Sequence, residues 1–280
     1  MVVSQISYVH FYVEDADYWR DWCCQCLDFA LVATHESTQV LQQGAFQFWI
    51  SDSRAPEVGE YLAKHGAGVA AIGLQQDDFT ATYPMPDSDL VYQLGNWQLH
   101  KSDFSLFSHI DHLVINLPAG SLGSIASWHR QYLGLEIGDR FQIQTKHSGL
   151  ESLVMQNPDR SVQIPLNQPT DPNSQVQEFL DYHHGAGVQH LALYTPNIHQ
   201  TVATLRSRGL EFLGTQPPIL LEQQQGGRAI AQIFTLPLFG QPTFFLEIIQ
   251  RYQGAVGFGA GNFQALFEAV ESEQLSSKSF

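Results

Sequence analysis

The sequence KHGAGV at residues 64–69 recurs as HHGAGV at residues 183–188, and this repetition decides the fold. A helical pattern precedes each copy, at residues 57–64 and 175–182, and an apolar run typical of a strand follows it. Self-similarity over a long interval indicates that one structural unit occurs twice in a chain. We therefore expect two halves with the same order of helices and strands.

A second correspondence lies upstream of the first. The segment VHFYV at residues 9–13 resembles DHLVI at residues 111–115. Each segment is followed by a helical pattern that contains a tryptophan, Trp22 in the first half and Trp128 in the second. The repeat therefore extends over most of each half.

The fold class follows from this duplication. Residues 1–104 would form one domain and residues 105–280 the other, with a junction near residues 101–108. Each domain divides into two modules of strand–helix–strand–strand–strand order (βαβββ). We predict an α+β protein whose tandem βαβββ modules form two curved mixed-sheet half-barrel domains, plus a C-terminal lid helix. The inner face of such a sheet can hold a ligand.

Hydrophobic periodicity gives the individual elements of the second half. In chain order they are a strand at 110–117, a helix at 122–132, strands at 136–146, 150–156 and 161–165, a strand at 187–195, a helix at 198–208, and strands at 228–235 and 243–251. A loop rich in Pro, Gln and Gly is predicted at 216–227.

The composition excludes several classes of partner. The 280 residues carry a formal net charge of −15, which argues against binding to nucleic acid or to anionic membranes. No run approaches the roughly eighteen apolar residues of a membrane span, and the N-terminal residues are typical of a first strand and not of a signal peptide. Cys23, Cys24 and Cys26 are too close together on one predicted helix for an ordinary disulfide. Buried thiols in a reducing cytoplasm are preferred over a cysteine metal site.

The run FFLEIIQR at residues 244–251 places Glu247 in the middle of a predicted strand. A buried carboxylate costs several kcal/mol unless it is paired or bound to a metal ion. The simpler alternatives are that Glu247 faces solvent, or that it pairs with Arg251.

The segment that follows this strand resembles a lid. Gly257, Gly259 and Gly261 predict a sharp turn, and Asn262 is a candidate N-cap. An amphipathic helix is expected at residues 263–272. A strand with a buried acid, followed by a turn and a capped helix, indicates a site that can be covered.

Two histidines could join Glu247 on the same inner face. His112 in IDHLVI and His190 in VQHLAL are each flanked by alternating apolar residues, so both point to one side of the sheet. Two imidazoles and one carboxylate are the ligand set that suits Fe(II) with open positions for substrate and oxygen. A hydrogen-bonded core histidine is the alternative interpretation for each.

The first half lacks the complete set. Alignment of GVAAIGL with GVQHLAL places Ala71 where the second histidine would be. The counterpart of the acidic ligand is expected at residues 97–100, which contain no acid, and His10 and His100 occupy ligand-like positions. We therefore expect the metal site in the second half alone.

With these residues in place, the chain resembles the 4-hydroxyphenylpyruvate dioxygenase family of the vicinal oxygen chelate (glyoxalase/extradiol dioxygenase) superfamily. The resemblance is dense over residues 108–273. It is carried by GAGVQHLAL at 185–193, QIFT at 232–235, FFLEIIQR at 244–251 and GFGAGNFQALFE at 257–268. The loop before QIFT is shorter than in many members of the family.

The resemblance implies an iron site and a substrate pocket. The matched iron ligands are His112, His190 and Glu247. The matched substrate-binding positions are Ser152, Pro165, Asn167, Gln175, Gln189, Gln232, Phe234, Phe245, Phe258, Asn262, Phe263 and Leu266. Among them, Ser152, Asn167, Gln189 and Gln232 would act in catalysis by hydrogen bonds to substrate and to the iron site. The phenylalanines would clamp an aromatic ring and exclude water, with ordinary core packing as the alternative for Phe245 and Phe258.

By the same resemblance, the chain would be an Fe(II)-dependent dioxygenase that converts 4-hydroxyphenylpyruvate and O₂ to homogentisate and CO₂. Its product would serve tyrosine catabolism or plastoquinone and tocopherol biosynthesis. The alternatives are 4-hydroxymandelate synthase, an extradiol ring-cleaving dioxygenase, and a metal-free module that binds an aromatic ligand. Pro165 and Phe263 favour the dioxygenase, because the mandelate synthases typically carry Thr and Ile there. A cytoplasmic homo-oligomer, dimer or tetramer, is expected.

Overall fold

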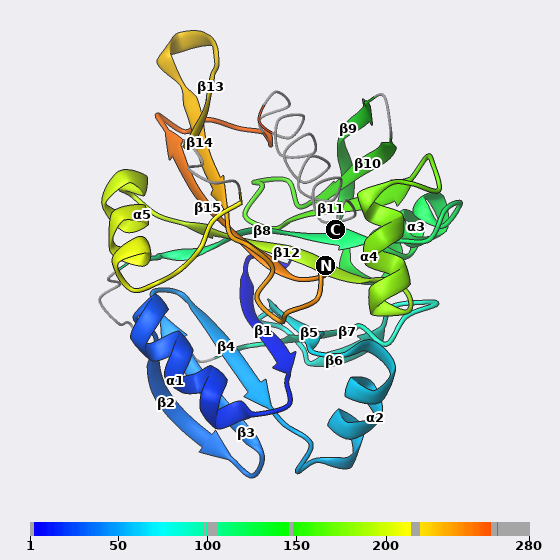
Figure 1. Ribbon diagram of the computed structural model, residues 1–280. Helices are drawn as coiled ribbons and strands as arrows, with labels where there is room; N and C mark the ends of the chain where they lie inside the picture. The colour runs from blue at the N-terminus through cyan, green and yellow to red at the C-terminus, as the bar shows by residue number, and fades with distance from the viewer. Residues whose placement is uncertain are drawn as a thin grey trace, which may run out of the picture.

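The computed structural model describes residues 3–97, 99, 106–145, 148–213, 219–258 and 262. Two mixed sheets dominate it, one in each half of the chain (Figure 1). The elements of the first half are β1 (Ile6–Tyr12), α1 (Ala16–Leu27), β2 (Ala30–His35), β3 (Thr38–Gln43), β4 (Phe46–Ser51), α2 (Pro56–His65), β5 (Gly68–Gln75), β6 (Ala81–Pro84) and β7 (Val91–Gly95). The elements of the second half are β8 (His109–Asn116), α3 (Leu122–Leu133), β9 (Glu136–Gln144), β10 (Gly149–Gln156), β11 (Gln163–Pro169), α4 (Gln175–His183), β12 (Gly187–Tyr194), α5 (Ile198–Ser207), β13 (Leu220–Gln223), the 3₁₀ turn Gln225–Gly227, β14 (Ala229–Phe234) and β15 (Phe245–Tyr252).

The two sheets share one plan. The seven strands of the first sheet follow the order β2-β3-β4-β1-β5-β7-β6, and the eight of the second follow β13-β14-β15-β12-β8-β11-β10-β9. In each, two antiparallel strands form the centre, β1 with β5 and β8 with β12, and each central strand has a parallel neighbour on its other side. The duplication found in the sequence is therefore a duplication of sheet topology, and the α+β prediction is confirmed.

Helix starts agree with the local sequence. Asp15 caps α1 by accepting a hydrogen bond from the Tyr18 amide, and Ser174 caps α4 by accepting one from Val176. Pro56 opens α2, where its fixed φ suits the first helical turn. The predicted helices at 57–64, 122–132, 175–182 and 198–208 are confirmed within one residue at each end.

The halves pack against each other through a continuous apolar core. The ring of Phe11 on β1 lies 5.3 Å from that of Phe244, centroid to centroid, beside β15. Elsewhere along the contact, the hydroxyl of Tyr92 on β7 lies 2.9 Å from Nε2 of the buried His129 on α3. Figure 1 shows the first half, blue to cyan, against the second half in green to orange.

Three details of the predicted topology are wrong. No helix separates β5 from β6, because the connection at residues 76–80 is too short to hold one. The strand predicted at 161–165 is β11, which begins two residues later and continues to Pro169, so Asn167 lies within it. The predicted loop at 216–227 contains the short strand β13, which extends the sheet by pairing with β14.

The remaining predictions concern the cysteines, membrane-spanning helices, the domain junction and the lid helix. All three cysteines are free, and Cys23 and Cys26 are buried in α1, as expected of thiols packed as small apolar groups. Within the described residues, no helix is both long and apolar enough to cross a membrane. The junction at 101–105 and the predicted lid helix at 263–272 lie outside the described residues, and the domain boundary stays a prediction.

Candidate metal centre and substrate pocket

His112, His190 and Glu247 come from three neighbouring strands at the centre of the second sheet, β8, β12 and β15. Ala192 on β12 pairs with His112 on one side and with Glu247 on the other. His190 lies two residues before Ala192 and therefore projects from the same face. The three side chains converge on the inner face of the curved sheet, where each is at most 3% exposed.

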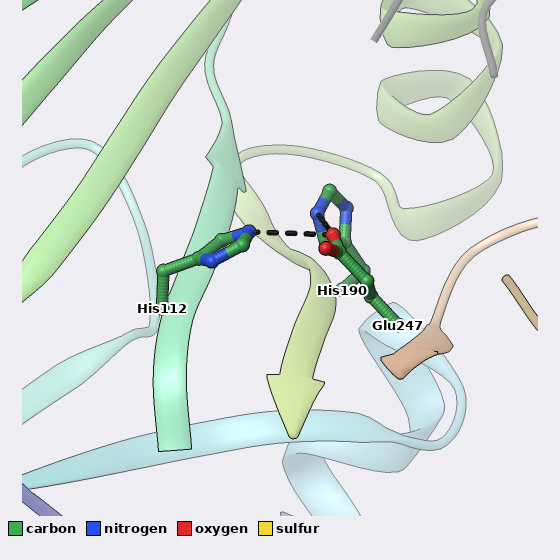
Figure 2. Close-up of side chains that lie close together, drawn as sticks. All are labelled: His112, His190 and Glu247. Carbon is green, nitrogen blue, oxygen red and sulfur yellow. Dashed lines mark ion pairs between the residues drawn. The ribbon is translucent and has the colours of Figure 1, made fainter. Parts of the chain in front are cut away.

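Their donor atoms face one another. One ligand atom from each residue lies within 4.8 Å of the other two. The distances from Oε2 of Glu247 are 3.3 Å to Nε2 of His112 and 3.5 Å to Nε2 of His190. Figure 2 shows the carboxylate reaching both imidazole rings, with dashed lines along these two contacts.

Each of the three side chains is held from behind by a second residue. Nδ1 of His112 donates to Oδ1 of Asp111 at 2.8 Å, and Nδ1 of His190 lies 3.1 Å from Oε1 of Gln189. Because both partners present oxygen acceptors, each Nδ1 can donate its proton to them, and each Nε2 is directed at Glu247, where it would bind a metal ion in its deprotonated form.

The second oxygen of Glu247 is also occupied. Its Oε1 accepts a hydrogen bond of 2.7 Å from Nε2 of Gln232 on β14. This bond leaves Oε2 as the oxygen that faces the histidines. The carboxylate is thus oriented to offer a single atom to an ion.

The electrostatics of the cluster are those of a site built around positive charge. Burial alone would raise the pKa of Glu247, but the charge of His112 and hydrogen bonds from both histidines outweigh burial and lower this pKa to about 2. Burial would lower the pKa of His112, but Glu247 and Asp111 raise it to about 9. The pKa of His190 is lowered, since burial dominates there. A proton on His112 therefore supplies the positive charge that the buried carboxylate requires.

The cluster also has the donor set for a divalent cation. The cation would be bound by two neutral imidazoles and one carboxylate, which is the donor set of facial metal sites with open positions. Within the described residues, His112, His190 and Glu247 are the one group of His, Cys, Asp and Glu side chains close enough together to hold an ion. The cluster thus has the composition, burial and orientation of a metal site.

A small pocket opens over the ligand atoms. Besides the three ligands and Gln232, it is lined by Val114, Phe141, Ser152, Pro165, Phe234 and Phe258. The free space between these side chains is about 20 Å³, which is room for about one water molecule. Phe258 is part of this lining, and its ring packs edge-on against His112 at a centroid distance of 4.9 Å.

Several of the predicted pocket residues contact the lining instead of forming it. Phe245 stacks on the ring of His190 at 4.8 Å, and Nδ2 of Asn262 donates to Oε1 of Gln232 at 2.7 Å. Gln175 is buried as the first residue of α4 but does not line the pocket. Phe263 and Leu266 lie outside the described residues, as does the predicted capping of the terminal helix by Asn262.

A polar cluster lies at one end of the pocket, where β8, β10 and β11 are neighbours. Ser152 pairs directly across the sheet with Asn167, whose Nδ2 donates to Oδ1 of Asn116 at 3.5 Å. The Ser152 hydroxyl, Oδ1 of Asn167 and Nδ2 of Asn116 are buried without a hydrogen-bond partner among the described residues. Buried polar atoms of this kind are satisfied by a ligand or by water.

Sequence reasoning missed Asp111, Asn116 and Arg251 as parts of this site. Arg251 had been the alternative partner of Glu247, but the structure pairs it with Asp111, through contacts of 2.6 Å from Nε to Oδ2 and from Nη2 to Oδ1. This charge holds the pKa of Asp111 below its usual range in spite of burial. The Asp-His dipeptide at the ligand was the available signal, because metal-binding histidines commonly donate to a carboxylate.

In the first half, the residues that correspond to His112 and Glu247 are not the predicted ones. The pair β1 and β5 has the same register as the pair β8 and β12, with β-bulges at the same positions. In this alignment Tyr8, which is opposite Gly73, corresponds to His112, which is opposite Ala192. The counterpart of His112 is therefore Tyr8 and not His10, which lies two residues further along the same face. The counterpart of Glu247 is Gln93 on β7 and not a residue within 97–100.

The first-half arrangement consists of neutral groups. The hydroxyl of Tyr8 donates to Oε1 of Gln93, in the position where histidine faces glutamate in the second half. Ala71 stands at the counterpart of His190, as predicted. Neutral groups have thus replaced all three ligands, and residue His100 lies outside the described residues.

Comparison with known proteins identifies the superfamily and the family. Residues 111–229 match the model of the Glyoxalase/Bleomycin resistance protein/Dioxygenase superfamily. An uncharacterised protein of Synechocystis is 32% identical over 96% of this chain and 97% of its own. The fold is that of a triple mutant of 4-hydroxymandelate synthase from Streptomyces coelicolor, which is 24% identical with a TM-score of 0.87, over 98% of this chain and 100% of that one.

Relatives named 4-hydroxyphenylpyruvate dioxygenase match either part of this chain or most of it. The protein of Xenopus tropicalis is 38% identical over 60% of this chain, and the match spans 50% of that relative's length. The protein of Legionella pneumophila is 30% identical over 89% of this chain and 88% of its own. The chain therefore belongs to the 4-hydroxyphenylpyruvate dioxygenase family, within the glyoxalase and dioxygenase superfamily whose fold it shares.

Proposed function

We propose that this chain is an Fe(II)-dependent dioxygenase that converts 4-hydroxyphenylpyruvate and O₂ to homogentisate and CO₂. The observation that carries the proposal is the buried cluster of His112, His190 and Glu247, which faces a pocket lined by aromatic side chains. Membership in the family supports the same reaction. The cluster also favours an enzyme over a metal-free binding module, since two imidazoles and a carboxylate with converging donor atoms are the ligand set of a metal site with open positions.

The proposed roles of the protein groups follow from their contacts. His112, His190 and Glu247 would hold Fe(II), with Gln232 fixing the free oxygen of the carboxylate. Bound Fe(II) would supply oxygen activation and chelation of the 2-oxo acid, which is chemistry that side chains alone do not provide. Gln189 would keep the ring of His190 in the orientation that metal binding requires.

Substrate would be oriented by the two ends of the pocket. Once Phe258 has moved to admit substrate, the aromatic ring would lie between Phe234 and Phe258, which would also exclude water from the reacting atoms. The unpartnered polar atoms of Ser152, Asn167 and Asn116 suit the phenolic hydroxyl at the far end of the substrate. A buried hydroxyl of the substrate would satisfy groups that the protein leaves without a partner.

Substrate entry requires a side chain to move, because the free space is about 20 Å³. Phe258 is the candidate, since it packs against His112 and follows Gly257, whose φ of 83° favours glycine. Its withdrawal would open the metal face, and its return would close the pocket over the ring.

The test is product identification. The protein is loaded with Fe(II) without oxygen, mixed with 4-hydroxyphenylpyruvate and exposed to air, and the products are separated by liquid chromatography against authentic homogentisate and 4-hydroxymandelate, because these two isomers have the same mass. Homogentisate with one equivalent of CO₂ is expected. Predominant 4-hydroxymandelate would assign the chain to the synthase reaction, and no turnover with a fully iron-loaded protein would contradict both.

The oligomeric state stays a prediction. Sedimentation of the purified protein would distinguish the expected dimer or tetramer from a monomer.

A further inference from the structure

From the contacts around the metal cluster we infer that the ion pair of Asp111 and Arg251 is a positioning unit, which fixes the ring of His112 for metal binding and seats the following segment against that ring. The inference rests on the proposed metal site. It assigns a role to two residues that do not line the pocket and that donate no atom to the ion.

The ion pair is bidentate and buried. Nε and Nη2 of Arg251 each contact a different oxygen of Asp111, both at 2.6 Å. The side chain of Asp111 is 4% exposed and that of Arg251 13%. Paired donors of a guanidinium fix the plane of a carboxylate, which a single contact does not do. Oδ1 of Asp111 is thereby aimed at Nδ1 of His112, 2.8 Å away.

A β-bulge makes this contact possible. The pairing of β8 with β12 passes from His112 opposite Ala192 to Ile110 opposite Leu193, so that Asp111 has no partner in the ladder. In a regular strand, neighbouring residues point to opposite faces. The bulge turns Asp111 out of that alternation and brings its carboxylate beside the ring of the next residue.

The other end of the guanidinium holds the chain that leads to the pocket. Nη1 of Arg251 donates to the carbonyl of Gly257 at 2.8 Å and lies 3.4 Å from the carbonyl of Ala255. The next residue, Phe258, packs edge-on against His112. One arginine therefore contacts both the carboxylate behind the metal ligand and the backbone that carries the ring in front of it.

The first half provides an internal comparison. The same bulge occurs in β1, between Ile6 and Tyr8, but there the bulged residue is Ser7. Counting four residues on from the correspondence of Gln93 with Glu247 places Trp97, two residues past the end of β7, at the counterpart of Arg251. The half in which the metal ligands have been replaced thus has the bulge without the acid or the arginine. The ion pair accompanies the ligand set and not the fold.

The experiment compares Arg251→Lys and Asp111→Asn with the wild-type protein, using Co(II) as the bound ion. Arg251→Lys keeps the positive charge but cannot make paired contacts, and Asp111→Asn keeps an acceptor for His112 without the negative charge. Arg208→Lys is the control, because Arg208 makes a single, more exposed ion-pair contact of 2.7 Å with Asp28 away from the site. Circular dichroism verifies folding, and a chelator competition measures Co(II) affinity.

Both test variants should bind Co(II) about 10- to 100-fold more weakly than wild type, with an altered visible spectrum of the bound ion. Arg251→Lys should also speed hydrogen exchange of residues 255–258, and Arg208→Lys should match wild type throughout. Should Arg251→Lys not fold, the Co(II) spectrum and affinity of Asp111→Asn decide the question. Wild-type affinity and an unchanged spectrum in the folded variants would overturn the inference while leaving the metal site intact. Failure of the wild-type protein to bind Co(II) would overturn the metal site and the inference together.

Discussion

Replacing Glu247 with glutamine should change the pH dependence of stability in the metal-free protein. In the wild type, the buried carboxylate and the His112 ring hold each other charged, since the pKa of Glu247 is lowered to about 2 and that of His112 is raised to about 9. Glutamine has the same shape and can still accept a hydrogen bond, but it carries no charge. The substitution therefore removes the electrostatic part of the contact with little change in packing.

The magnitude follows from the displacement of the His112 pKa, from 6.5 to about 9. Because one pKa unit is about 1.4 kcal/mol, this displacement is worth ~3 kcal/mol of folding free energy. The Glu247 displacement describes the same interaction and is not added to it.

The sign is set by which state binds protons more tightly. A raised histidine pKa stabilises the fold fully below 6.5, and this contribution is lost as pH rises through 9. The lowered Glu247 pKa stabilises the fold above 4.5 and is lost as pH falls through 2. The pair therefore contributes most between pH 4.5 and 6.5.

The assay is urea unfolding of the metal-free protein at several pH values between about 6 and 9.5. We expect the free energy of unfolding of the wild type to fall by ~3 kcal/mol over this range through this pair. In Glu247→Gln the larger part of this loss should disappear, with Asp111 maintaining the remainder. Glu136→Gln, at an exposed carboxylate beside Arg130, is the control and should follow the wild type. Identical pH profiles for Glu247→Gln and wild type would refute the charge pairing.

Three further predictions concern other parts of the molecule. Burial lowers the pKa of His129 to about 4. The contribution of neutral His129 to folding stability is therefore fully present above pH 6.5 and falls by up to ~3 kcal/mol as pH drops to 4. His129→Gln should keep a contact with Tyr92 but lose this acid sensitivity, as measured by urea unfolding between pH 7 and 4.5. His10→Ala should leave metal content and turnover unchanged, because the first half has neutral groups at its ligand positions, and loss of an iron equivalent would disprove this. Phe258→Ala should open the pocket without removing a metal ligand. The variant should retain its iron but consume more oxygen per homogentisate formed. One oxygen consumed per homogentisate in the variant would show that Phe258 does not shield the reaction.

Periodicity was sufficient to place the three ligand side chains on one face. His112 and His190 have apolar neighbours on both sides, and Glu247 is enclosed by a hydrophobic run, so alternation alone orients them inward. The duplicated HGAGV motif likewise predicted two related sheets. These features depend on residues close together in sequence, which is where pattern reasoning is strong.

Strand register and contacts between residues far apart in the sequence could not be predicted from such local patterns. Tyr8 and His10 lie on the same face of β1, and only the strand pairing shows which of them corresponds to His112. The contact of Asp111 with Arg251 spans 140 residues and depends on a bulge that the sequence does not mark. The apolar pair at the start of β13 was hidden in a Pro- and Gln-rich loop and becomes a strand because β14 offers an edge to pair with.

The most direct test of the central claim is iron stoichiometry in the wild type and in His112→Ala, His190→Ala and Glu247→Gln. Each protein is incubated anaerobically with Fe(II), desalted, and measured for iron content, circular dichroism and turnover of 4-hydroxyphenylpyruvate. The wild type should retain about one iron per chain, and each variant should remain folded yet lose stoichiometric iron or turnover, because a three-ligand site has no ligand to spare. A folded Glu247→Gln protein with full iron content and full activity would contradict the account.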